Sequence, residues 1–308
     1  MRNAFFVVES PMQLITAIEA NEHFKPSKSV LFIRYNEEDR NDGQINKILS
    51  YGKFDSKYSI KIKEYSKFAY IKLLNVYALL ILYRPSVLFI GDYKANFMKM
   101  IYRLFRKEKC IFLDDGAQSS YIFYQDPKAN MFSYFKFPVE ENTQRLYIHN
   151  TFPYFRGILK HYKKEILDKT VYFIGAPLLE KNMISAELFD LYFSKVASFY
   201  LNQGYKIKYL PHRHEDNEKL KKYSTIEVMV LDEPVELYML HANALPSCVA
   251  SFYSAALYTI QQIFSEQIEH VQSFYFPTEI MMVSEDTKLK IESVYKTLGE
   301  VVTVNKNY

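Results

Sequence analysis

The stretch IFLDDGAQSS, residues 111–120, joins an apolar run to two adjacent carboxylates. Three apolar residues lead directly into Asp114, Asp115 and Gly116. Such a short apolar run is typical of a strand buried on both faces, and Asp-Gly is a common turn dipeptide. The stretch therefore predicts a strand of a parallel sheet that ends in a polar turn.

The same pattern of an apolar run followed by polar residues recurs along the chain, with helical patterns between most of the runs. The other predicted strands are AFFVVES (4–10), SVLFIR (29–34), VLFIGD (87–92), VYFIGAP (171–177), YKIKYLP (205–211), IEVMVLD (226–232), PSCVASF (246–252) and EHVQSFYF (269–276). Alternation of strands and helices predicts an α/β protein with parallel sheets covered on both faces. We expect two doubly wound Rossmann-type domains of the GT-B-like class, facing a central cleft.

The segments between the strands complete this prediction. We place the domains at 1–158 and 159–308, with a last helix and tail that can cross back to the first half. Ser10 and Pro11 suit the N-cap and first turn of a helix. NEEDRNDGQ (36–44) is interpreted as a polar loop, and LLNVYALLILY (73–83) as a buried helix too short to span a bilayer.

Composition and charge limit the classes of partner. The 308 residues are 49% hydrophobic and 24% charged, and the net charge of +4 does not favour nucleic acid. Cys110 and Cys248 adjoin apolar runs and are expected to be buried thiols in a reducing compartment. The N-terminus lacks a signal-peptide pattern, so we expect a cytoplasmic protein. The basic stretch FRGILKHYKKEILDK (155–169) is either a solvated helix face or a contact with the inner membrane.

Ligands of doubly wound sheets bind beyond the carboxyl ends of the strands, so polar residues after apolar runs are the candidate sites. These are Glu9-Ser10, Asp114 to Gly116, His212 to Glu215, and Ser251 to Ser254. One of two neighbouring carboxylates can act as a base, because repulsion raises a pKa. Hydroxyls at a helix start form an anion site. Each segment can instead be an ordinary turn or helix cap.

Two more features bear on the chemistry. Glu236 follows a proline in a predicted helix, where a carboxylate can accept hydrogen bonds from a ribose diol. His212 and His214 have no third ligand at a clear spacing, so no metal is predicted. The sequence has no GxGxxG, GxxxxGK, D-x-D or GxSxG motif, which disfavours dinucleotide, P-loop, metal-bound nucleotide-sugar and α/β-hydrolase sites.

The order of these motifs resembles the bacterial sialyltransferases of GT-B fold, including the lipooligosaccharide sialyltransferases and polysialyltransferases. That family has a D/E-D/E-G motif, an HP motif and a Ser-Ser/Thr motif. Here the first is intact at 114–116, His212 is followed by Arg213 instead of proline, and Ser254 is followed by Ala255. ESPMQL (9–14) is similar to the SPLQ-type start of such enzymes.

The resemblance implies an inverting, metal-independent sialyltransferase without a cofactor. CMP-sialic acid would be the donor, and the acceptor would be a hydroxyl of a bacterial surface glycan such as capsule, O-antigen or lipooligosaccharide. Asp114, or else Asp115, would be the base. His212, supported by Arg213, would stabilise or protonate the leaving phosphate. The remaining donor-binding residues would be Ser251 and Ser254 at the phosphate and Glu236 at the ribose.

Three alternatives stay open. One is another GT-B glycosyltransferase that uses CMP-Kdo or a nucleotide-diphosphate sugar. A second is a non-catalytic sugar-nucleotide-binding protein of the envelope pathway. The third is a membrane-surface scaffold.

Overall fold

The computed structural model describes residues 3–62, 69–91, 95–105, 109–116, 118–126, 128–138 and 145–308. The chain divides into two compact units, residues 1–154 and 155–308, and each is described by itself. The boundary expected from the sequence, between 158 and 159, differs from this division by a few residues. Asp92, predicted to end a strand, lies outside the described residues.

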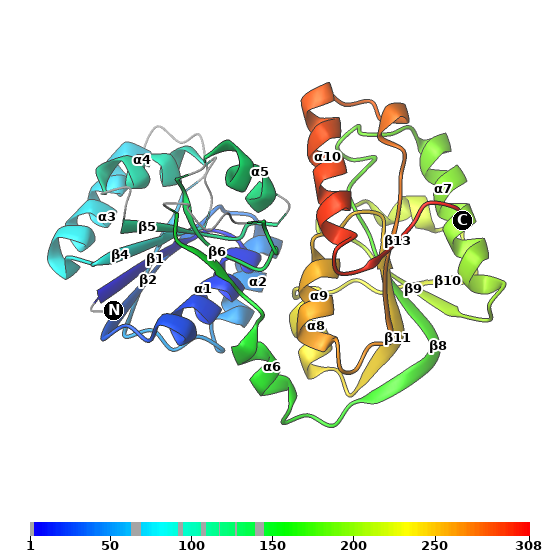
Figure 1. Ribbon diagram of the computed structural model, residues 1–308, viewed down its shortest axis with the longest axis horizontal. Coiled ribbons are helices and arrows are strands. Elements are labelled where there is room, and N and C mark those ends of the chain that lie inside the picture. Colours follow the sequence, from blue (N-terminus) through cyan, green and yellow to red (C-terminus); the bar gives the residue numbers. More distant parts are fainter. Residues whose placement is uncertain are drawn as a thin grey trace. The chain divides into compact units, whose positions relative to one another are not determined.

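The first unit contains a seven-stranded parallel sheet in the order β3-β2-β1-β4-β5-β6-β7. Its strands are β1 (Asn3–Val8), β2 (Lys28–Tyr35), β3 (Ser56–Lys61), β4 (Val87–Ile90), β5 (Cys110–Leu113), β6 (Asn130–Ser133) and β7 (Tyr147–His149). Its helices are α1 (Pro11–Phe24), α2 (Asp39–Ile48), α3 (Ala69–Tyr83), α4 (Asn96–Leu104) and α5 (Gln118–Gln125). Figure 1 shows α1 and α2 on one face of this sheet and α3, α4 and α5 on the other.

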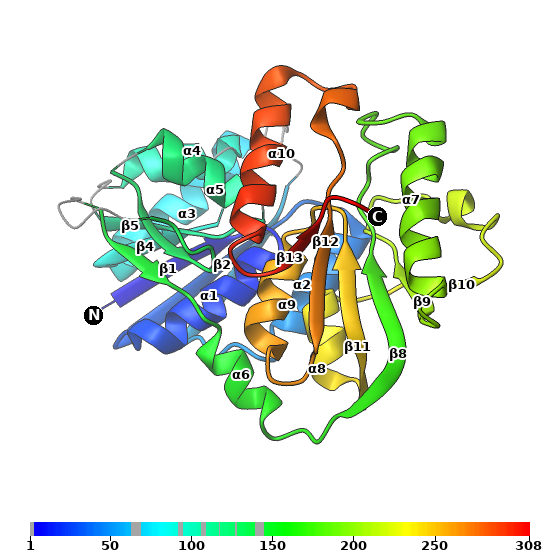
Figure 2. The same cartoon turned by 45° about the vertical axis from the view of Figure 1, so that its right-hand side comes forward.

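The second unit repeats the architecture with a six-stranded parallel sheet in the order β10-β9-β8-β11-β12-β13. Its strands are β8 (Glu165–Ile174), β9 (Lys206–Leu210), β10 (Ile226–Val228), β11 (Ala244–Ser251), β12 (His270–Phe274) and β13 (Thr303–Asn305). Its helices are α7 (Ala186–Leu201), α8 (Val235–His241), α9 (Ala256–Phe264) and α10 (Glu285–Leu298), and α6 (Pro153–Leu159) spans the boundary. Figure 2 shows this sheet, with α8 and α9 on one side and α7 on the other.

Buried aromatic side chains fill both cores. In the first unit Phe6 stacks on Phe89 with ring centroids 4.5 Å apart. In the second, Phe173 packs edge-on against Phe193 at 5.3 Å. The last helix, α10, places Ile291 and Tyr295 in the second core, and its predicted return to the first half stays a prediction.

In each sheet the strand order reverses its direction at one place, which is called the switch point. The chain moves outward from β1 through β2 to β3, then returns to the other side of β1 at β4. The second unit does the same with β8, β9 and β10, then β11. In doubly wound sheets the ligand binds beyond the strand ends at this point, so the loops after β1 in the first unit and after β8 and β11 in the second lie at the predicted ligand site.

The structure corrects several local predictions. The loop predicted for 36–44 is mostly helix, because α2 begins at Asp39 with acidic residues in its first turn and buries Ile45 and Ile48 one turn apart. Segment 155–169 is not one helix: α6 ends at Leu159 and β8 begins at Glu165. Cys110 and Cys248 are buried thiols, as predicted.

The helix predicted for 73–83 exists as part of α3, but it is not buried. Val76 and Leu80 face the core, while Leu74, Ile81 and Leu82 are exposed. The sequence was misleading here because an apolar run without a polar face is expected in the interior.

Candidate functional site

Asp114, the residue directly after β5, is enclosed by protein. Its side chain has no exposed surface. One carboxyl oxygen accepts a 2.7 Å hydrogen bond from the Ser133 hydroxyl, and the other accepts one of 2.5 Å from the Tyr134 backbone N–H. Burial raises the pKa of Asp114 to about 7, although these hydrogen bonds oppose the rise. Asp114 therefore connects the carboxyl ends of β5 and β6.

The next residue, Asp115, lies on the other side of the strand end and is partly exposed. Its Oδ1 accepts a 2.9 Å hydrogen bond from the Ser10 hydroxyl, and its backbone N–H donates to the Ser119 hydroxyl at 3.0 Å. Gly116 follows with φ +68°, a conformation that glycine adopts without a Cβ penalty. The turn thus presents the Asp115 carboxylate, not that of Asp114, at the surface.

Ser10 connects the loop after β1, at the switch point of the first sheet, to Asp115. Its hydroxyl accepts the Gln13 backbone N–H at 3.3 Å, so it caps α1 as predicted, and Pro11 occupies the first turn. The Gln13 side chain turns back to accept the Glu9 backbone N–H at 2.8 Å. The Glu9 carboxylate pairs with buried Arg34 at 2.5 Å. The loop after β1 is therefore held in place beside Asp115.

These positions bear on the choice of base. A general base must come within hydrogen-bond reach of the proton that it removes. Asp114 has the pKa of a base that works near neutral pH, but both of its oxygens are engaged and none of its surface is accessible. Asp115 has the access. The structure therefore departs from the expectation that Asp114 faces the acceptor.

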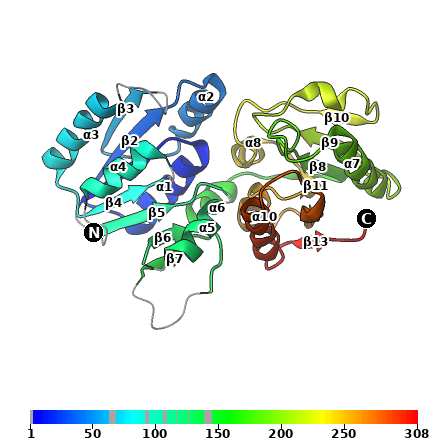
Figure 3. The same cartoon turned by 90° about the horizontal axis from the view of Figure 1, so that it is seen from above.

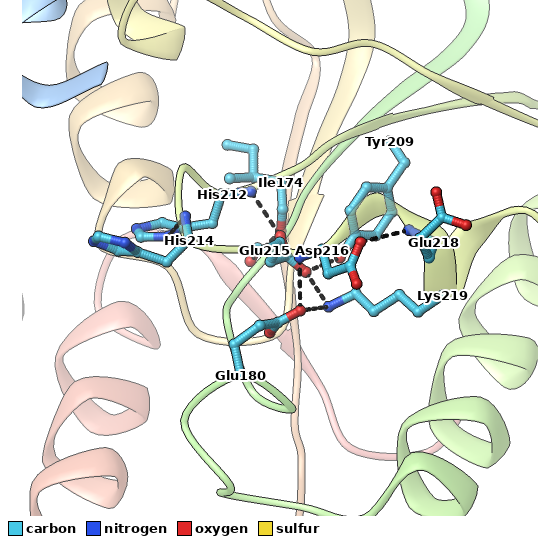
Figure 4. Close-up of polar contacts among 10 residues, drawn as sticks. Ile174, Glu180, Tyr209, His212, His214, Glu215, Asp216, Glu218 and Lys219 are labelled. Atoms are coloured by element: carbon cyan, nitrogen blue, oxygen red, sulfur yellow. Dashed lines mark hydrogen bonds and ion pairs between the residues drawn. The ribbon is translucent and has the colours of Figure 1, made fainter. Parts of the chain in front are cut away.

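In the second unit, the loop after β9 is built around the carboxylate of Glu215 (Figure 4). Glu215 Oε2 accepts the His212 backbone N–H at 2.6 Å, and Oε1 accepts the Tyr209 hydroxyl at 2.8 Å. Lys219 Nζ pairs with Oε1 at 2.5 Å. The Glu215 side chain has no exposed surface, and this burial raises its pKa, whereas the Lys219 charge lowers it.

Further contacts extend this cluster toward the loop after β8. Glu180 Oε1 accepts the Asp216 backbone N–H at 2.9 Å and pairs with Lys219 Nζ at 3.2 Å. Asp216 in turn caps a short 3₁₀ helix, Asn217–Leu220, through a 3.0 Å hydrogen bond from the Glu218 N–H. The loop that carries His212 is therefore anchored at both ends.

Gly175, the residue after β8, leaves room for this anchor. A Cβ at Gly175 would lie 1.9 Å from Glu215 Oε2 and 2.7 Å from the Tyr209 hydroxyl. Both distances are far below van der Waals contact, so any side chain at Gly175 displaces the Glu215 carboxylate. The end of the central strand and the histidine loop are thus fitted to each other.

His212 and His214 lie side by side at the tip of the loop, with ring centroids 5.3 Å apart. The His214 backbone N–H donates to His212 Nδ1 at 3.2 Å, so the proton of the neutral His212 ring is on Nε2. Arg213 donates from Nε to His214 Nε2 at 3.2 Å. The loop therefore carries a ring N–H donor and a guanidinium, groups that suit an anion.

The two serines after β11 differ in environment. Ser251 is fully buried, and its hydroxyl donates to the Ile174 carbonyl at 2.8 Å, so it joins β11 to β8. Ser254 is partly exposed just before α9, and its hydroxyl accepts the Ala256 backbone N–H at 3.2 Å. Ser254 is therefore the serine that can face a ligand, and the predicted role of Ser251 in anion binding does not fit its position.

Glu236 lies in the first turn of α8 and is 5% exposed. Its Oε1 accepts a 2.6 Å hydrogen bond from the Thr259 hydroxyl in α9, and burial raises its pKa. The carboxylate thus joins α8 to the start of α9, the helix that Ser254 precedes.

The second unit therefore brings its predicted residues to one edge of the sheet. β8 lies between β9 and β11, so the histidine loop and the Ser254 loop flank its end. Parallel strands are about 4.8 Å apart, so the ends of β9 and β11, from which these two loops start, are about 10 Å apart across β8. The anchoring role of Glu215 and its close contact with Gly175 were not assigned from the sequence. The available signals were a carboxylate three residues after His212 and a glycine directly after an apolar run.

Comparisons with known proteins bear on the fold. No protein-family model matches the chain, and no curated protein sequence matches it significantly. The structure is similar to that of UDP-GlcNAc 2-epimerase from Methanocaldococcus jannaschii, with a TM-score of 0.53 at 12% identity, covering 100% of this chain and 94% of that one. It is also similar to UDP-GlcNAc 2-epimerase from Neisseria meningitidis bound to UDP-GlcNAc, with a TM-score of 0.53 at 10% identity, covering 97% of this chain and 91% of that one. At these identities the likeness shows the fold alone, and it confirms the predicted GT-B-like class of two Rossmann-type domains.

Proposed function

We propose that the protein is a glycosyltransferase that moves sialic acid from CMP-sialic acid to a hydroxyl of a bacterial surface glycan, with inversion. The observation that carries the proposal is the pair of loops flanking the end of β8. One loop presents His212 and Arg213, and the other presents Ser254 at a helix start. Together they fit a phosphate at the switch point of a Rossmann sheet.

The leaving phosphate is the ligand of these loops. His212 donates from Nε2, Arg213 adds positive charge, and the Ser254 hydroxyl supplies a further donor just before α9. A departing monophosphate carries less charge than a diphosphate, so these groups can stabilise it without a metal ion. The nucleotide identity, CMP, comes from the sialyltransferase resemblance of the sequence motifs.

Glu236 is proposed to contact the donor ribose. In the structure its Oε1 is held by Thr259, so binding of a ribose diol requires the other oxygen, or a change of partner at the first turn of α9. Supporting this role is its position on the helix that packs against α9, the helix preceded by Ser254.

On the acceptor side we assign the base to Asp115, with Asp114 as the buried residue that positions it. Asp115 removes the proton of the acceptor hydroxyl as its oxygen attacks the anomeric carbon of sialic acid. The bond from that carbon to the CMP phosphate breaks on the opposite face, and its electron pair leaves with CMP. Attack opposite to the leaving group yields an α-sialoside.

One rival rests on a specific observation. Structures of similar fold hold UDP-GlcNAc, and one holds UDP-GlcNAc with UDP. A nucleotide-diphosphate-sugar enzyme, either a transferase or a 2-epimerase, is therefore the second candidate. CMP-Kdo transfer and non-catalytic sugar-nucleotide binding are further alternatives that the same experiment distinguishes.

The test is thermal stabilisation of the full chain by CMP, UDP and GDP, each with and without EDTA, followed by turnover. A bound ligand raises stability in proportion to the logarithm of its excess over its dissociation constant. We expect a shift with CMP that persists in EDTA, and sialic acid transfer from CMP-sialic acid that Asp115→Asn abolishes. A shift with UDP alone, with epimerisation or transfer of UDP-GlcNAc, would establish the rival. CMP binding without turnover of CMP-sialic acid or CMP-Kdo indicates a binding protein.

A further inference from the structure

One face of α3 exposes four large apolar side chains to solvent. Leu74 is 64% exposed, Tyr77 44%, Ile81 55% and Leu82 70%. Positions 74, 77 and 81 repeat at helical spacing, and Leu82 extends the same side of the last turn. Isolated exposed leucines are common on soluble proteins, but four large apolar side chains along one helix mark an interaction surface.

Two exposed basic residues lie close to this apolar face. The described residues of α3 and α4 and of the turn after α3 include Arg84, Lys99 and Arg103. Arg84, directly after α3, and Arg103, in α4, are exposed. Because α3 packs beside α4 (Figure 3), both basic residues belong to the same region of the first unit.

The end of α3 is fixed by polar contacts that do not use this apolar face. The Tyr83 hydroxyl is 2.6 Å from that of Tyr58 on β3, and Lys28 Nζ lies 4.7 Å from the centre of the Tyr83 ring. Arg84 adopts φ +43° as the chain leaves the helix. The helix is therefore held against the sheet by its inner face and its C-terminal end. The apolar side chains of its outer face, at 74, 77, 81 and 82, take no part in these contacts and stay exposed to solvent.

We propose that this surface of α3 docks on an anionic lipid bilayer, with the helix lying in the interface. An interfacial helix buries an apolar face at the boundary of headgroups and acyl chains while nearby Lys and Arg contact anionic headgroups. Within the described residues no helix is both long and apolar enough to cross a membrane. The exposed Arg84 and Arg103 beside the apolar side chains favour an anionic bilayer as the partner of this surface. This inference is independent of the proposed function.

The experiment is flotation of the full chain with vesicles of phosphatidylcholine alone, and with about one third phosphatidylglycerol added. We expect binding to the anionic vesicles that weakens at high salt, and little binding to the neutral ones. Leu74→Glu with Leu82→Glu should lower the partition coefficient about tenfold or more. Arg84→Gln and Arg103→Gln should each lower it about fivefold.

The matched control is Leu289→Glu, because Leu289 is 69% exposed but lies on α10 in the second unit. It should leave vesicle binding unchanged, and circular dichroism should show that all the variants are folded. Failure of the wild-type chain to float with anionic vesicles overturns the proposal. So does equal binding by the Leu74 and Leu82 double variant, or equal binding to neutral vesicles. A dimer in sedimentation that this double variant dissociates would assign the surface to a second copy.

Discussion

The fit between Gly175 and Glu215 yields a prediction that needs no knowledge of the ligand. In Gly175→Ala, the new methyl group would lie 1.9 Å from Glu215 Oε2 and must push the carboxylate aside. The displaced oxygen loses its 2.6 Å bond from the His212 N–H, and a hydrogen bond to a charged group contributes about 1.5–3 kcal/mol. Overpacking adds about 1–3 kcal/mol. We expect Gly175→Ala to lower the free energy of unfolding by about 2.5–6 kcal/mol.

The assay is urea unfolding of the full chain followed by circular dichroism. Gly157→Ala is the matched control, because Gly157 lies within α6 and has nothing within 4 Å of its Cβ position. It should raise stability by about 0.5–1 kcal/mol, the usual helix preference for alanine.

A double-mutant cycle makes the reasoning refutable. In a Glu215→Ala background the colliding oxygen is absent, so Gly175→Ala should cost at least about 2 kcal/mol less than in the wild type. Some cost remains because the Tyr209 hydroxyl lies 2.7 Å from the new Cβ. If the two single costs simply add, the collision with Glu215 is not the cause of the loss, and the account of the anchored loop fails.

Three further predictions concern the proposed site. Asp115→Asn should abolish sugar transfer while leaving thermal stabilisation by CMP within a degree or so of wild type; loss of both together would argue against a role confined to the acceptor. Ser254→Ala should weaken CMP binding about five- to tenfold, as expected for about 1–1.5 kcal/mol from one hydrogen bond, and isothermal titration measures it. Because the pKa of Asp114 is raised from 3.8 to about 7 on folding, its stabilising contribution is full below about pH 4 and is lost as the pH rises through 7. This corresponds to roughly 4 kcal/mol at most, and Asp114→Asn should flatten the decline in urea-unfolding stability between pH 4 and 8; an unchanged slope would contradict the raised pKa.

Strands that are buried on both faces were predictable, because such strands appear in the sequence as an uninterrupted run of apolar residues. β1, β4, β5, β8 and β11 all coincide with such runs. β3 was missed because it is an edge strand, SKYSIK, whose side chains are mostly exposed and polar. β13 is short and follows a helix, so nothing in its sequence separates it from a tail.

The site was predictable at the level of segments but not of individual residues. The rule that ligands bind beyond strand ends found the loops after β5, β9 and β11. Which of two adjacent residues faces solvent depends on the partners that the fold supplies. Ser133 and Tyr134 enclose Asp114, and the Ile174 carbonyl takes up Ser251. These partners are distant in sequence, so no local pattern reveals them.

The Ser10 hydroxyl makes two hydrogen bonds. It accepts one from the Gln13 N–H, which caps α1, and it donates the other to Asp115, which is distant in the sequence. An acceptor hydroxyl that hydrogen-bonds the Asp115 carboxylate competes with the Ser10 hydroxyl for the same oxygen. Release of Ser10 would alter its bond from the Gln13 N–H and loosen the first turn of α1. The exchange rate of the Gln13 amide hydrogen with solvent would then rise when acceptor binds, so a backbone amide outside the acceptor contact would report its occupancy.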